Sequence, residues 1–210
     1  MNEFFNPEKG IWAWLSAMVD VVGLSILWLM LCLPAVTIGP ATAALYYTVV
    51  KYVRGREPGA FGGYLRSFAA NFKVGSLATL LCCGAGAVLA GGYGVMRAST
   101  GTGSTAELLF AVYHFALFLP AGVLCWLFPL LGRFTFGVKG LFVTALQLAV
   151  RHLPSTVVVV LLTAETAAFC AANWWPALFM PAIAMLLASL FLERVFQKYA
   201  PELAGQDEEE

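Results

Sequence analysis

The stretch AELLFAVYHFALFLPAGVLCWLFPLL, residues 106–131, decides the fold class of this chain. It contains one charged side chain, Glu107, and it is longer than the roughly 20 apolar residues that a helix needs to cross a bilayer. A helix on the surface of a soluble protein would carry a polar face, and this stretch has none. It therefore predicts a transmembrane helix.

The composition of the whole chain supports the same class. Hydrophobic residues make up 60% of the 210 residues and charged residues 11%, whereas soluble domains carry about 25% charged residues. The mean hydropathy is +0.81. A soluble globule must solvate its surface, so this excess of apolar surface requires lipid as its solvent. The net charge of zero and the lack of a basic stripe argue against nucleic acid as a partner.

Further apolar runs predict an all-α, polytopic transmembrane helix bundle. A shorter helix over residues 40–53 either crosses the membrane with the help of residues 36–39, giving about six spans, or is re-entrant, giving five. Residues 1–196 are expected to form a single transmembrane domain, and residues 197–210 an acidic, disordered cytoplasmic tail. The other predicted spans cover residues 11–33, 74–96, 154–172 and 176–192.

Two amphipathic helices are expected to lie at the membrane surface. In the first, Phe61, Tyr64 and Phe68 recur at helical spacing, and the helix ends near Asn71 and Lys73. The second covers residues 133–152, from Arg133 to a contact end at Arg151. Lys and Arg are concentrated in the connections that contain these helices, so the positive-inside rule places them, and the C-terminus, in the cytoplasm. The helices either rest at the interface or dock a partner.

No motif for catalysis, nucleotide binding or metal binding occurs in the sequence. It has no phosphate-binding loop, no zinc-protease helix motif, no nucleophile elbow and no dinucleotide-binding fingerprint. Each of its five cysteines lies in an apolar run, and none has zinc-ligand spacing. We therefore expect a protein that is not an enzyme and that carries no cofactor or metal.

Two carboxylates lie near the middle of predicted spans, Asp20 in the first and Glu165 in the fifth. An ionisable group at that depth costs about 2.5–3.5 kcal/mol on insertion scales. They either serve a proton relay or a solute contact, or are protonated and bonded to hydroxyls of neighbouring helices such as Ser25 and Thr163.

The most informative stretch is the elbow Pro34-Ala35-Val36-Thr37-Ile38-Gly39-Pro40. Pro40 suits the first turn of a helix, and Thr37 or Gly39 is placed to cap that helix. The elbow is either a broken-helix solute site, in which freed backbone groups face a ligand, or a tight structural hairpin.

The segment LPAVTIGPATAAL, residues 33–45, resembles the signature of the YesL-like family of bacterial membrane proteins, a domain of unknown function. Weaker similarities are Asn71-Phe72-Lys73, Pro129 with Arg133-Phe134, and His152-Leu153-Pro154. The resemblance implies a small multi-pass protein of the plasma membrane in Gram-positive bacteria. It also implies genes located beside those for sugar importers and glycan degradation, and it supplies no active-site residue.

Two functions follow as hypotheses. By analogy with the family, the chain is an accessory or regulatory component of carbohydrate uptake by an ABC importer. Alternatively, it is a stand-alone transporter or channel for a small solute, with Asp20 and Glu165 near a midplane cavity. Expected partners are the lipid bilayer, sugar ABC importer subunits and a second copy of the chain.

Overall fold

The computed structural model describes residues 7–55, 57–99 and 104–206. Within these residues the fold is all-α, as the sequence predicts, with seven α-helices and three short helical turns. In chain order the elements are α1 (Pro7–Leu31), η1 (Ala35–Thr37), α2 (Ile38–Thr48), η2 (Val49–Arg54), α3 (Ala60–Ser99), α4 (Ser104–Arg133), α5 (Val138–Arg151), α6 (Leu153–Ala172), η3 (Trp175–Leu178) and α7 (Met180–Gln206).

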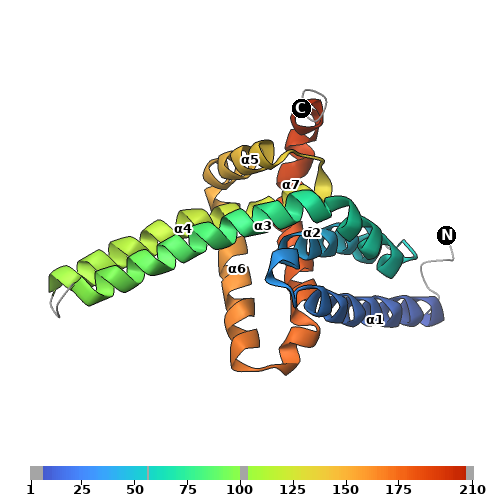
Figure 1. The fold of residues 1–210 in the computed structure, drawn as a ribbon. Helices are drawn as coiled ribbons and strands as arrows, with labels where there is room; N and C mark the ends of the chain where they lie inside the picture. Colours follow the sequence, from blue (N-terminus) through green and yellow to red (C-terminus); the bar gives the residue numbers. More distant parts are fainter. Residues whose placement is uncertain (1–6, 56, 100–103, 207–210) are drawn as a thin grey trace.

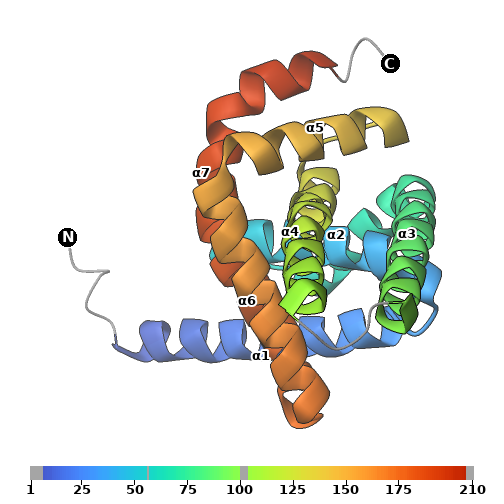
Figure 2. The ribbon, with the colours of Figure 1, turned by 90° about the vertical axis from the view of Figure 1, so that its left-hand side faces the viewer.

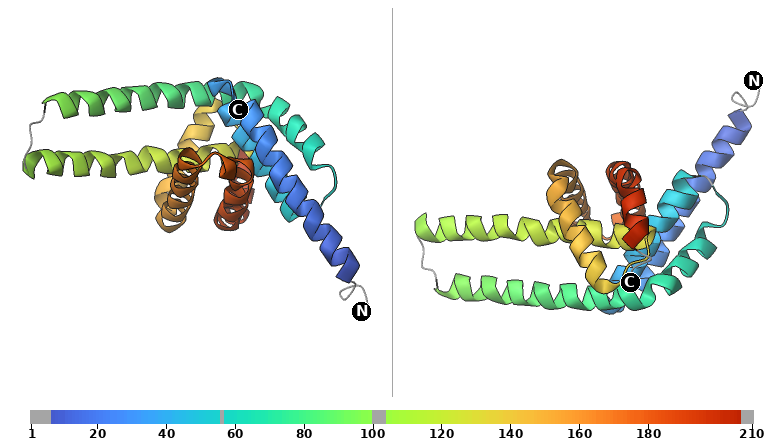
Figure 3. Two further views of the ribbon diagram at one scale, coloured as in Figure 1. Left: turned by 90° about the horizontal axis from the view of Figure 1, so that it is seen from below. Right: turned by 90° about the horizontal axis from the view of Figure 1, so that it is seen from above.

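Two long helical hairpins define the shape of the molecule. Helices α6 and α7 run side by side, and the α3–α4 hairpin extends across them and projects far beyond the body (Figure 1). Viewed along α6 and α7, the α3–α4 hairpin lies nearly in the plane of the page (Figure 3). The two hairpins therefore cross each other at a large angle.

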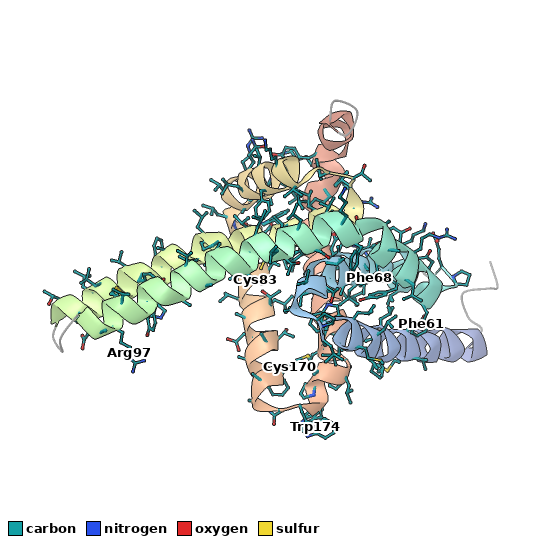
Figure 4. All side chains as sticks on the ribbon, viewed as in Figure 1. Phe61, Phe68, Cys83, Arg97, Cys170 and Trp174 are labelled. Atoms are coloured by element: carbon teal, nitrogen blue, oxygen red, sulfur yellow. The ribbon has the colours of Figure 1, made fainter. Side chains whose placement is uncertain are left out.

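Four helices among the described residues are long and apolar enough to cross a membrane: α3, α4, α6 and the part of α7 up to Tyr199. Helix α1 contributes a shorter apolar helix, Met18–Leu31. By helix length and composition the chain is thus a multi-pass membrane protein. Trp174 lies at the turn between α6 and α7, and Arg97 lies near the free end of the α3–α4 hairpin (Figure 4).

Helix α2 is the centre of the fold. It packs against α1, α3, α4 and α7, and Ala41, Ala43, Ala44 and Tyr46 have no exposed surface. Small side chains on this helix let the surrounding backbones approach closely. Its eleven residues span roughly 16 Å at 1.5 Å per residue, about half of a bilayer core. The short apolar run after the elbow is therefore a core helix of the protein.

Helix α3 is continuous over 40 residues, whereas the sequence predicted a separate surface helix followed by a span. The helix changes direction along its first half (Figure 3), which accommodates both parts in one element. Tyr64 is fully buried, but Phe61 and Phe72 remain exposed. Ala60 and Ser67 are also buried in this part of α3, which packs extensively against α2.

The second predicted amphipathic helix, residues 133–152, is present in shorter form as α5, which covers Val138–Arg151. Leu141, Ala145, Leu148 and Ala149 form its buried stripe, and they pack mainly against α4. Helix α5 lies across the end of the α6–α7 hairpin opposite to Trp174 (Figures 1 and 2). We call this end, which carries Arg133, Arg151 and Arg194, the basic end.

Helix α7 continues to Gln206 and changes direction near its end (Figure 2). The sequence predicted a disordered tail from residue 197 onward. Residues 197–206 are helical in the structure, and residues 207–210 lie outside the described part.

Candidate functional site

The elbow is a structural crossing between α2 and α3. The hydroxyl of Thr37 donates to the carbonyl oxygens of Leu31 and Pro34, and it does not cap α2. The backbone N–H of Gly39 donates instead to Oγ1 of Thr79 in α3, at 2.9 Å. The first backbone N–H groups of a helix have no partner within the helix, and a solute could bind to them. Here the N–H of Gly39 is bonded to a side chain of the protein, so the contacts favour the tight hairpin over the solute site.

Glycine makes this crossing possible. A Cβ atom at Gly75 would lie 2.8 Å from the backbone nitrogen of Pro40, and one at Gly39 would lie 2.5 Å from the carbonyl oxygen of Gly75. Neither position has room for a side chain. Pro34 at the start of the elbow is exposed, while Gly39 and Pro40 are buried.

The structure does not bring Asp20 and Glu165 together. Asp20 is half-buried on α1, Glu165 is exposed on α6, and these helices are not among the pairs that pack extensively. Neither carboxylate has a hydrogen-bond partner among the described residues. Ser25 accepts from the backbone N–H of Ala182, and Thr163 bonds its own helix. An apolar groove of about 380 Å³ near Asp20 is lined by Met18, Val19, Val22, Gly23 and Phe61.

The predicted contact ends lie apart from one another. Asn71 donates to the carbonyl oxygen of Ser67 within α3, at 3.0 Å, and Lys73 is exposed. Arg151 is exposed in the last turn of α5. Of the candidate residues named from the sequence, Arg133 is the one that joins a buried polar cluster.

That cluster joins α2, α4 and α7. The hydroxyl of Tyr46 donates to Oε1 of Glu193 at 2.9 Å, and Nη2 of Arg133 lies 3.6 Å from Oε2 of the same carboxylate. Tyr46 is fully buried and Glu193 is 4% exposed. A buried carboxylate needs such partners, because desolvation of an unpaired charge is costly.

Sequence reasoning missed Glu193. It placed this residue just after the last predicted span, at the start of a polar segment, and the partner Tyr46 lies 147 residues away in the sequence. One signal was present: Glu193 follows buried Ser189 by four residues, which places the two side chains on the same face of a helix.

Close packing at Gly132 sets the position of Arg133. A Cβ atom at Gly132 would collide with the carbonyl oxygen of Ala43 in α2. Helix α4 therefore ends directly against α2, and its last residue is brought beside Tyr46. A second link runs from η2 to α7, where Nη1 of Arg54 lies 3.4 Å from the carbonyl oxygen of Ser189.

A pocket of about 440 Å³ opens beside this cluster. Helix α4 supplies Gly132 and Arg133 to its wall, and the segment after η2 supplies Glu57. The remaining wall comes from α2 and η2, and it includes Tyr46, Tyr47, Val50 and Lys51. The pocket thus combines aromatic surface with side chains of both charges.

Lys51 is held at the pocket by aromatic neighbours. Its Nζ donates to the hydroxyl of Tyr47 at 3.1 Å and lies 5.5 Å and 5.6 Å from the ring centres of Tyr47 and Tyr52. The hydrogen bond with Tyr47 raises the pKa of Lys51 above its ordinary value.

No group of His, Cys, Asp and Glu side chains among the described residues could hold a metal ion. All five cysteines are free thiols. Cys83 and Cys170 lie on different hairpins (Figure 4).

Residues 21–93 match a family described as a protein of unknown function, DUF624. This segment is similar to the DUF624 family. The match confirms the resemblance to the YesL-like proteins and runs from within α1, through the elbow and α2, into α3. The DUF624 segment includes Tyr46, Lys51 and Glu57 of the pocket, while Arg133 and Glu193 lie outside it. No curated protein and no solved structure matches the chain.

Proposed function

We propose that this DUF624 protein is a non-enzymatic component of the plasma membrane that assists or regulates an ABC importer through its basic end. The observation that carries the proposal is the outward face of α5. Val143, Leu146 and Val150 are 55%, 45% and 51% exposed and follow one another at helical spacing. Lys139 and Arg151 flank them, so this face has the apolar centre and charged rim of a docking surface.

The partner class comes from the resemblance to the YesL-like family, which implies carbohydrate importers. The basic residues at this end place it in the cytoplasm under the positive-inside rule, where the ATPase subunits of such importers bind. This orientation puts the C-terminus in the cytoplasm.

Site-specific photo-crosslinking in membranes tests this function. A photoreactive residue at Leu146 is expected to capture a permease or ATPase subunit of a carbohydrate importer, identified by mass spectrometry. The matched control is Val95, which is 68% exposed and lies two residues before Arg97, near the free end of the α3–α4 hairpin (Figure 4). If position 146 captures no importer subunit, or if position 95 captures the same subunit equally well, the proposal fails.

The transporter alternative needs a cavity that contains both Asp20 and Glu165. Asp20 and Glu165 lie on separate helices, and the pocket at the basic end contains neither of them. No observation on the described residues favours that function over the first.

A further inference from the structure

We propose that the pocket beside Arg133 binds the phosphate ester of a small polyol, with the phosphate held between Lys51 and Arg133. This ligand site is separate from the outward face of α5, and the inference does not depend on the docking function proposed for that face. The pocket volume of about 440 Å³ falls within the range of small-molecule sites.

Arg133 retains most of its binding capacity. Its side chain is 46% exposed, and its one ion-pair partner among the described residues is Glu193, at 3.6 Å from Nη2. A guanidinium has five N–H donors in a planar fork that matches the oxygens of a phosphate. The remaining donors are therefore available on the pocket side.

The carboxylate of Glu193 supports Arg133 and does not compete for the ligand. Its side chain is 5% exposed, and its two oxygens face Tyr46 and Arg133. A ligand that enters the pocket meets the guanidinium first. The buried pair thus fixes the orientation of the guanidinium before the ligand arrives, which lowers the entropy cost of binding.

Lys51 of η2 supplies the second cation of the pocket lining. One of its three ammonium donors is used by Tyr47, and the contacts with the Tyr47 and Tyr52 rings hold the amine in place. Two cations on different elements that line one pocket favour an anionic group that accepts hydrogen bonds from both.

Glu57 indicates what the rest of the ligand is. Its carboxylate is exposed at the pocket wall and is an acceptor of hydrogen bonds. It would repel a bare phosphate, but it can accept from the hydroxyls of a polyol attached to the phosphate. A glycerol phosphate group satisfies both requirements, whether it is a soluble metabolite or the headgroup of phosphatidylglycerol.

The test uses the full chain purified in a neutral detergent and native mass spectrometry with three probes. These are glycerol 3-phosphate, dihexanoyl phosphatidylglycerol and, as the zwitterionic control, dihexanoyl phosphatidylcholine. Wild-type protein is expected to bind one of the first two probes more tightly than the third. Lys51→Gln is expected to weaken that binding about tenfold or more, because one charge-assisted contact is lost. Arg151→Gln, which removes a cation from the same end outside the pocket, is expected to bind as wild type does.

Arg133→Gln removes the cation that pairs with buried Glu193, and the single variant can fail to fold for that reason. The double variant Arg133→Gln/Glu193→Gln removes both charges and is measured beside it. Binding of glycerol 3-phosphate supports a soluble ligand, and binding of phosphatidylglycerol alone supports a lipid headgroup. The proposal is overturned if neither probe binds better than phosphatidylcholine. Equal affinity in wild type and Lys51→Gln, or an equal loss in Arg151→Gln, would also overturn it.

Discussion

The hydroxyl of Tyr46 donates a hydrogen bond of 2.9 Å to the carboxylate of Glu193, and the bond joins the central helix α2 to α7. Both groups are buried, and Arg133 of α4 approaches the same carboxylate from its more exposed side. Three helices that are distant in the sequence therefore meet at one polar contact. Tyr46 and Arg133 also line the pocket at the basic end, whereas Glu193 lies behind them and does not line it.

Removing either member of this hydrogen bond should destabilise the protein. Glu193→Ala leaves the buried hydroxyl of Tyr46 without an acceptor, which costs about 1–3 kcal/mol of unfolding free energy. The lost pairing with Arg133 adds little, because water can solvate its half-exposed guanidinium. Thermal unfolding in detergent measures the effect. Tyr47→Phe, which alters a hydroxyl bonded to exposed Lys51, is the control and should change stability by less than about 0.5 kcal/mol. A Glu193→Ala protein that melts as wild type does would contradict the role assigned to the cluster.

Glycines on α3 should differ sharply in their tolerance of alanine. Gly75→Ala should cost about 1–3 kcal/mol, since its methyl group would lie 2.8 Å from the nitrogen of Pro40 and the backbones must separate. A methyl group at Gly84 would meet no neighbouring atom within 4 Å, so Gly84→Ala should leave stability unchanged or raise it by up to about 1 kcal/mol through helix propensity. The comparison of the two melting temperatures checks the α2–α3 crossing. Equal melting temperatures would show that the helices do not approach so closely.

The side chain of Thr79 should be essential for the start of α2. Thr79→Val keeps the shape of the residue but leaves the buried N–H of Gly39 without its acceptor, at a cost of about 1–3 kcal/mol. Thr79→Ser restores the hydroxyl and should recover most of the loss. Thermal unfolding of the three proteins side by side measures both effects. If the serine variant is no more stable than the valine variant, the hydrogen bond to Gly39 is not what stabilises this crossing.

Acidification should destabilise the corner between α5 and α6. Burial, followed by the charges of Lys198 and Arg151, lowers the pKa of His152 below its ordinary value of 6.5. Its Nε2 is buried and has no hydrogen-bond partner among the described residues. The unfolded chain therefore binds a proton before the folded chain does, so stability is complete above pH 6.5 and falls as the pH drops below it.

Melting temperatures measured from pH 8 to pH 5 test this behaviour. Wild type should lose stability over the acidic part of that range, and His152→Phe should lose less. His114→Phe, a change on the exposed side of α4, should retain the wild-type profile. Identical profiles for wild type and His152→Phe would assign the pH dependence to another group.

Glycine-rich sequence illustrates the limit of prediction from a pattern. Small residues such as Gly84, Gly86, Gly91 and Gly94 of α3 allow close helix packing, yet a side chain at each of these positions would face open space. The close approaches occur instead at Gly39, Gly75 and Gly132. A helix made of small residues can pack closely on any side, and which side is used depends on where its neighbours lie.

Hydropathy along the chain was sufficient to predict the membrane class, the all-α fold, and the long apolar helices over residues 106–131 and 154–172, which lie within α4 and α6. These properties depend on local runs of apolar residues, because the apolar run of each spanning helix must be long enough to cross the bilayer. The crossing of the hairpins, the burial of α2 and the pairing of Glu193 with Tyr46 were decided by the tertiary structure alone. Each depends on contacts between residues far apart in the sequence, and no local period or composition records such contacts.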